Sequence, residues 1–242
     1  GICLTAKVLL GSGEYRPRFR GNFHLNGKIQ REALNVAVPV ALERITISSG
    51  QIIMTRMVST LGTVSLAANY VAVTAEQICY MPAYGIASAS TALVSQNVGA
   101  GQWKKAKYFG KLTGWISVAL TAVLAAAMFI WSDALGSAFS SDPQVARLSG
   151  QMLRIVSVAE PLFSMSTVMS GALRGAGEAK YPFYVGVVCM LCIRVSLGAL
   201  MLFGFGMGLS AVWIAMAVDL NLRGIANYLR FVRGKWIPAC EK

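Results

Sequence analysis

The sequence predicts an all-α, polytopic membrane protein with six transmembrane helices. Of its 242 residues, 55% are apolar and 13% are charged. Soluble domains carry about a quarter charged residues, so this composition indicates a chain that is mostly surrounded by lipid. The apolar residues gather in runs long enough to cross a bilayer core of about 30 Å as helices of roughly 20 residues.

The apolar runs divide into six expected spans, of which the second is longer than a bilayer requires and can tilt or project into water. The connections alternate in charge, as expected where short cytoplasmic loops hold the excess of lysine and arginine. Because one span more or fewer would break this alternation, we expect six crossings with both ends of the chain in the cytoplasm. The spans are 34–58, 66–98, 112–132, 148–172, 183–206 and 208–229.

The formal charge of +12 belongs mainly to the connections on one side. No RNA or DNA motif accompanies it, so we expect these residues to meet anionic lipid headgroups and no nucleic acid. The opposite loops hold Asp133, Asp142 and Arg147. The basic residues are Arg16, Arg18, Arg20, Lys28 and Arg31 before the first span; Lys104, Lys105, Lys107 and Lys111 after the second; Arg174 and Lys180 after the fourth; and Arg230, Arg233, Lys235 and Lys242 after the sixth.

Prolines and glycines mark kinks and ends of the expected helices. A proline inside a span removes a helix hydrogen bond and usually bends the helix. Glycines near the ends allow close helix approach or a positive φ. We assign structural roles to Pro39, Pro82, Gly99, Gly101, Pro161, Gly175 and Gly177.

Glu76 is the strongest candidate for ion or substrate binding among the ionisable residues at membrane depth. An ionisable side chain there costs a few kcal/mol of free energy unless it faces the protein interior or water. It belongs to a polar stripe on one helical face. A carboxylate there can bind a proton, a sodium ion or a cationic substrate; the alternative is a buried carboxylate that only fastens helices. The stripe consists of Asn69, Val73, Glu76 and Tyr80, spaced 4, 3 and 4 residues apart.

Two further carboxylates are candidates for the same chemistry. Glu43 lies one turn after Pro39, and its neighbour Arg44 points about 100° away around the helix. Glu160 immediately precedes Pro161, where the interrupted hydrogen bonding leaves a carbonyl free to join an ion site.

The remaining intramembrane charges are interpreted as structural. Asp219 and Arg223 are four residues apart and predict a pair on the helix surface. Arg154 and Arg194 are expected to act as counter-charges, with a role in gating as the alternative.

Several classes of function are not expected. The chain has five cysteines and one histidine, and the Cys189–Cys192 pair lies in an apolar run with no second pair. These cysteines fit small apolar helix residues better than a redox or zinc site. With no phosphate-cradling loop and no Ser/His/Asp set, we expect no enzyme, no catalytic residues, no metal and no cofactor.

Four segments resemble multidrug and toxic compound extrusion (MATE) transporters. "AANYVAVTAEQICYMPAYGIASASTALVSQNVGAGQWKKA" (67–106) resembles the eighth helix of that family and the basic loop after it. "GALRGAGEAKYP" (171–182) is similar to the exit of the tenth helix, "RFVRGKW" (230–236) to the segment after the twelfth, and "FSSDPQV" (139–145) to the outer loop before helix ten.

The resemblance implies two six-helix lobes related by a pseudo-twofold axis, of which this chain supplies the second. Residues 1–30 are then the end of a preceding helix and a basic linker, 31–236 the lobe and 237–242 a cytoplasmic tail. It further implies export of organic cations or other amphipathic compounds across the cell membrane, driven by Na⁺ or H⁺ through alternating access. "GICLTAKVLLG" at the start favours a fragment of a longer protein, with an amino-terminal lobe as partner.

The resemblance implies roles for the polar stripe and for Glu43. The stripe beginning at Asn69 falls on the cavity-lining eighth helix, and Glu43 falls on the seventh helix, which bears an ion-binding carboxylate in some subgroups about one turn farther from the proline. The tenth helix of those subgroups carries an aspartate, for which this chain has only Glu160.

Two rival interpretations stay open. A lipid-linked precursor flippase of the same superfamily would need several cations for its pyrophosphate, and Arg154 and Arg194 are consistent with that. A non-transporting truncated membrane partner is the other.

Overall fold

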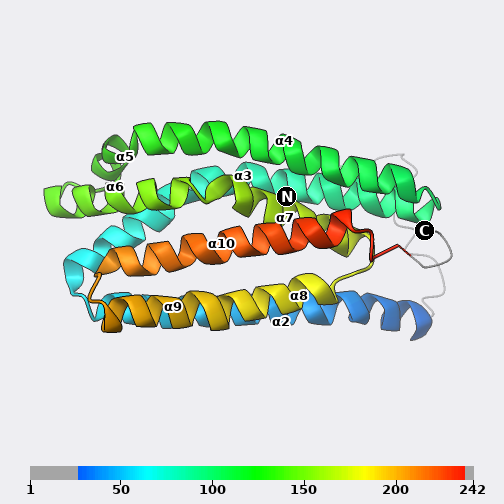
Figure 1. Ribbon diagram of the computed structural model, residues 1–242, viewed down its shortest axis with the longest axis horizontal. Coiled ribbons are helices and arrows are strands. Elements are labelled where there is room, and N and C mark those ends of the chain that lie inside the picture. The colour runs from blue at the N-terminus through cyan, green and yellow to red at the C-terminus, as the bar shows by residue number, and fades with distance from the viewer. Residues whose placement is uncertain (1–26, 238–242) are drawn as a thin grey trace, which may run out of the picture. The chain divides into compact units, whose positions relative to one another are not determined.

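The computed structural model describes residues 27–237, and their regular secondary structure is entirely helical (Figure 1). The expected preceding helix and linker up to residue 26, and the tail from residue 238, lie outside the described residues. Residues from Asn35 onward form one compact unit, and the first turns of α2 up to Leu34 belong to another. The helices are α2 (Gly27–Ser59), α3 (Thr63–Gly99), α4 (Trp103–Ile130), α5 (Ser132–Phe139), α6 (Pro143–Ser157), α7 (Glu160–Gly175), α8 (Lys180–Val187), η1 (Val188–Val195), α9 (Ser196–Ala199), η2 (Leu200–Gly204) and α10 (Leu209–Val232).

The predicted count of six spans is not exact. Within the described residues, four helices are long and apolar enough to cross a membrane, and the bent pair α6 and α7 makes a fifth if it is one span. Helix α3 covers the expected span 66–98 but is not among them, because polar residues along its length lower its hydropathy. The four are Ala33–Ser59, Trp103–Ile130, Lys180–Gly204 and Leu209–Val232.

The expected span 148–172 is broken. Helix α6 ends at Ser157, and α7 begins at Glu160 after a bend of 57°. Pro161 lies in the first turn of α7, where its missing N–H would have had no helical partner. Pro39 and Pro82, in contrast, lie inside α2 and α3. The break thus places Glu160 at a helix start inside the bundle.

Hydroxyl groups and small residues join the helices. The Thr113 hydroxyl of α4 donates to Ser90 of α3 at 2.8 Å, and Thr121 of α4 donates to Ser164 of α7 at 2.8 Å. Such pairs and close backbone contacts are the usual means of holding helices together in lipid, where the hydrophobic effect between helices is absent.

The two "GAG" segments, 99–101 and 175–177, end α3 and α7 in the same way. Gly101 has a φ of 70° and Gly177 a φ of 85°, values that only glycine adopts readily. In each case the next residue closes the helix with a backbone hydrogen bond of 2.8 Å. These bonds run from Gln102 N to Asn97 O and from Glu178 N to Leu173 O.

Gly175 also sets the distance between α3 and α7. A Cβ atom at this position would lie 2.5 Å from the carbonyl oxygen of Thr91 and 3.2 Å from two more of its backbone atoms. Backbone atoms cannot turn aside as a side chain can, so the two helices approach this closely only because residue 175 is glycine.

We expect Gly175→Ala to lower the free energy of unfolding by about 1–3 kcal/mol, because α3 and α7 must separate to admit the methyl group. The midpoint of unfolding in a titration with sodium dodecyl sulfate measures the loss. Gly85→Ala is the matched control, since nothing lies within 4 Å of a Cβ there; it should be neutral or stabilising by about 0.5–1 kcal/mol. Equal midpoints for the two variants would contradict the close contact.

Candidate functional site

Glu76 and Glu160 form a buried carboxyl pair where α3 meets the start of α7. Both residues are 0% exposed, and their side chains are close enough to interact. The Tyr80 hydroxyl donates a hydrogen bond to Oε1 of Glu76. Oε2 of Glu76 and both oxygens of Glu160 have no hydrogen-bond partner among the described residues. Buried polar atoms are nearly always satisfied, so these oxygens mark a place for a proton or a small cation.

The local sequence explains why the pair forms. Glu76 lies on the buried side of α3, together with Ala72, Ala75 and Cys79. Glu160 lies in the first turn of α7, where the helix dipole favours negative charge. The pair therefore depends on the break between α6 and α7 as much as on α3.

An aromatic cluster of Tyr80, Tyr84 and Phe163 borders the pair. The rings of Tyr80 and Phe163 are 4.5 Å apart between centroids, and Tyr84 packs edge-on against both. The cluster is joined to the carboxyl pair through Tyr80, whose hydroxyl reaches Glu76.

Glu43 does not join this pair. Its Oε2 accepts a hydrogen bond of 2.6 Å from Nη2 of Arg174, which links α2 to α7. Both residues line a polar cavity of about 340 Å³ together with Arg44, Arg223 and Asn227. Arg174, assigned from the sequence to a cytoplasmic connection, lies within the last turn of α7.

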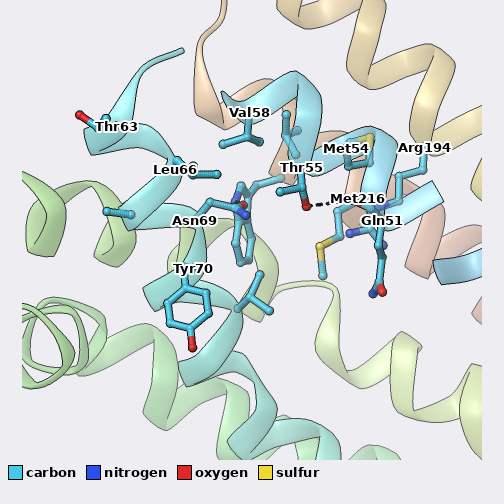
Figure 2. Close-up of a pocket in the computed structure, with 14 residues that line it drawn as sticks. Gln51, Met54, Thr55, Val58, Thr63, Leu66, Asn69, Tyr70, Arg194 and Met216 are labelled. Atoms are coloured by element: carbon cyan, nitrogen blue, oxygen red, sulfur yellow. Dashed lines mark hydrogen bonds between the residues drawn. The ribbon is translucent and has the colours of Figure 1, made fainter. Parts of the chain in front are cut away.

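The polar stripe of α3 is divided between two places. Asn69 accepts a hydrogen bond of 3.0 Å from Nε1 of Trp213 and, with Val73, lines a second cavity of about 680 Å³ (Figure 2). Glu76 and Tyr80 lie farther along the helix with Glu160. One helical face thus contributes to two sites, which the spacing of the residues alone does not reveal.

The predicted pair of Asp219 and Arg223 is confirmed, but it is not on the surface. Asp219 is 0% exposed, and both of its oxygens accept from Arg223, at 2.7 and 2.9 Å. Arg194 approaches the same carboxylate, with Nη1 3.8 Å from Oδ2. Arg154 instead pairs with Asp133 of α5 at 2.5 Å, and both side chains are substantially exposed.

Sequence reasoning did not find three features of the site. The first is the partnership of Glu43 with Arg174, which are 131 residues apart. The others are the contact of Trp213 with Asn69 and the position of Arg194 in the larger cavity. Charge at membrane depth and helical spacing were the available signals, and both identify candidate residues without their neighbours. Among the described residues no group of three or more His, Cys, Asp or Glu side chains is arranged to hold a metal ion.

Comparison with known proteins places the chain in a family. Residues 39–200, more than half of the chain, match the family model MatE. "Probable multidrug resistance protein NorM" of Thermotoga maritima is 29% identical over 209 residues, which cover 86% of this chain and 45% of the relative. "Uncharacterized transporter YisQ" of Bacillus subtilis is 24% identical over 215 residues, covering 89% of this chain and 47% of the relative.

A solved structure has the same fold. It is described as the outward-facing conformation of a multidrug resistance MATE family transporter of the MOP superfamily, and it superimposes with a TM-score of 0.88 at 17% identity. The alignment covers 97% of this chain and 52% of that one. The chain spans about half the length of the curated relatives it matches. It belongs to the MatE family, the multidrug and toxic compound extrusion transporters, and is a multi-pass membrane protein.

Proposed function

We propose that this chain is the carboxy-terminal lobe of a secondary-active exporter of organic cations or other amphipathic compounds. Antiport of a cation through alternating access drives the export, and Glu76 with Glu160 forms the cation site. The observation that carries this proposal is the buried carboxyl pair with three oxygens that lack a hydrogen-bond partner among the described residues.

The electrostatics of the pair support a cation-binding role. Two ionised carboxylates repel each other strongly in a low dielectric, and burial adds the cost of desolvating each charge. A bound proton or sodium ion relieves both costs, and its departure restores them. Because Glu160 begins α7 directly after the 57° bend, a change in the bend would alter the separation of the two carboxyl groups. Cation binding and helix geometry are thereby linked, as alternating access requires.

We propose the proton as the coupling ion. A protonated carboxyl group donates to its neighbour, so one proton satisfies an oxygen on each glutamate without further ligands. Sodium would instead need several oxygen ligands.

The second wall of the transport path comes, in this proposal, from an amino-terminal lobe. The length of the relatives, about twice the part that matches this chain, supports such a partner, and the alternation of basic and acidic loops supports cytoplasmic ends in a cell membrane. Asn69, Tyr80 and Glu43 are supporting residues of the cation and substrate sites.

The flippase alternative is less well supported. A pyrophosphate group needs several cations at one place, whereas Arg154 is paired with Asp133 on α5 and does not line the cavity of Arg194. A non-transporting partner would leave the unsatisfied carboxyl pair without a role.

In the complete transporter, we expect Glu76→Gln and Glu160→Gln each to reduce efflux of an amphipathic dye at least about tenfold, because an amide cannot gain and lose the coupling proton. Dye retention in intact cells measures the effect, with protein level checked in the membrane. Asp142→Asn, which changes the exposed N-cap of α6, is the matched control and should keep efflux. Glu43→Gln should cause a smaller loss, since Arg174 already pairs with this carboxylate. Wild-type efflux in both Glu76→Gln and Glu160→Gln would refute the assignment.

The coupling ion can be identified in proteoliposomes that contain the complete transporter. We expect an inward proton gradient to drive substrate movement, and a sodium gradient at constant pH to drive none. Glu160→Gln should remove the response to the proton gradient, because the pair then lacks one of its two titrating groups. A response to sodium alone would show that the pair binds sodium instead.

A further inference from the structure

The cavity that contains Asn69 is large enough for an organic ligand. It holds about 680 Å³, within the range of roughly 300–1,000 Å³ that is usual for sites of small molecules. Figure 2 shows side chains from different helices around it, with Asn69 and Tyr70 on one side and Arg194 on another. Its apolar walls are formed by Met54, Val58, Leu66, Val212, Trp213 and Met216.

Arg194 is the one charged side chain among the described residues that line this cavity. Its side chain is 13% exposed, and its Nε has no hydrogen-bond partner within residues 27–237. It lies in η1, a stretch of π-helix, a conformation that often occurs at functional sites. A guanidinium group in apolar surroundings is costly unless its donors are used.

The nearby acids do not use those donors. Asp219 gives both oxygens to Arg223, so two guanidinium groups share one carboxylate and Arg194 makes only the 3.8 Å approach. Glu76 is the other acid whose charge reaches Arg194, but it accepts from Tyr80 and lies against Glu160. Arg194 therefore remains at the wall of the cavity with donors that neither acid uses.

We propose that this cavity binds an amphipathic anion, an aromatic carboxylate or sulfonate, whose charged group bonds to Arg194. The two Nη groups of an arginine form a fork that matches two oxygens of such a group, and those of Arg194 are not among the buried atoms. The apolar body of the ligand lies against Met54, Met216 and the Trp213 ring. The hydrogen bond from Trp213 to Asn69 holds this ring in place. The inference rests on the proposed export of amphipathic compounds and names the class that this cavity selects.

A binding experiment on the full chain tests the selection. The chain is reconstituted in nanodiscs of phosphatidylcholine, whose headgroups carry no net charge. Equilibrium dialysis then measures binding of naphthalene-2-sulfonate and of 2-naphthyltrimethylammonium, which share one ring system and differ in charge, with empty nanodiscs correcting for partition into lipid. We expect the sulfonate to bind at least about tenfold more tightly than the ammonium compound.

Arg194→Gln should remove this preference by weakening sulfonate binding about tenfold, with little effect on the ammonium probe. Arg194→Lys should restore part of it, because the charge returns without the fork. Arg154→Gln is the matched control, since that arginine is paired with Asp133 outside the cavity, and it should bind as the wild type does.

Three results would overturn the proposal: equal or tighter binding of the ammonium probe, no specific binding of either probe, or an unchanged preference in Arg194→Gln. The wild-type comparison alone decides the matter if Arg194→Gln fails to fold. Binding in nanodiscs needs neither a gradient nor a second lobe. A negative binding result therefore contradicts only the anion site at Arg194, and a negative efflux result contradicts only the proposed role of Glu76 and Glu160.

Discussion

Burying charge inside an apolar helix bundle is the constraint on which the rest of this structure depends. Each ionised group at membrane depth needs a partner to offset its lost hydration. Two of the four buried acids described here have one: Asp219 has Arg223, and Glu43 has Arg174. Glu76 and Glu160 have only each other and Tyr80, with no basic group within 4 Å in the described part of the chain. This carboxyl pair is costly for stability because it lacks a basic partner, and we therefore assign the function to it.

The helices around the pair are held firmly at one end and interrupted at the other. Near its carboxyl end, α7 lies so close to α3 that Gly171 and Gly175 face the backbone at Ala87 and Thr91. At its amino end, α7 starts after a 57° break beside Glu160. A tightly packed contact moves little, whereas a break can absorb changes in backbone geometry. A change in charge at the carboxyl pair therefore acts on the amino-terminal end of α7, next to the break.

Much of the fold follows from the sequence, because apolar runs and helix-ending glycines are local signals. The expected span 34–58 lies within α2, and "GAG" ends both α3 and α7 as glycine chemistry requires. The break between Ser157 and Glu160 was missed, since Pro161 was interpreted as a kink within one span. The site was predicted less well. Helical spacing shows that Asn69 and Glu76 share a face, but which neighbour meets each turn depends on packing between distant segments, as the contact of Asn69 with Trp213 illustrates.

The order of sites along α3 places the carboxyl pair between the two cavities. The larger cavity is lined by the first turns of the helix, as far as Val73, and the smaller one by turns from Tyr84 to Thr91. Glu76 and Tyr80 lie between these two stretches. The ring of Phe163, which lines the smaller cavity, packs against the ring of Tyr80, with 4.5 Å between the centroids. The proposed cation site thus lies along α3 between the cavity that contains Arg194 and the cavity that contains Glu43 and Arg174.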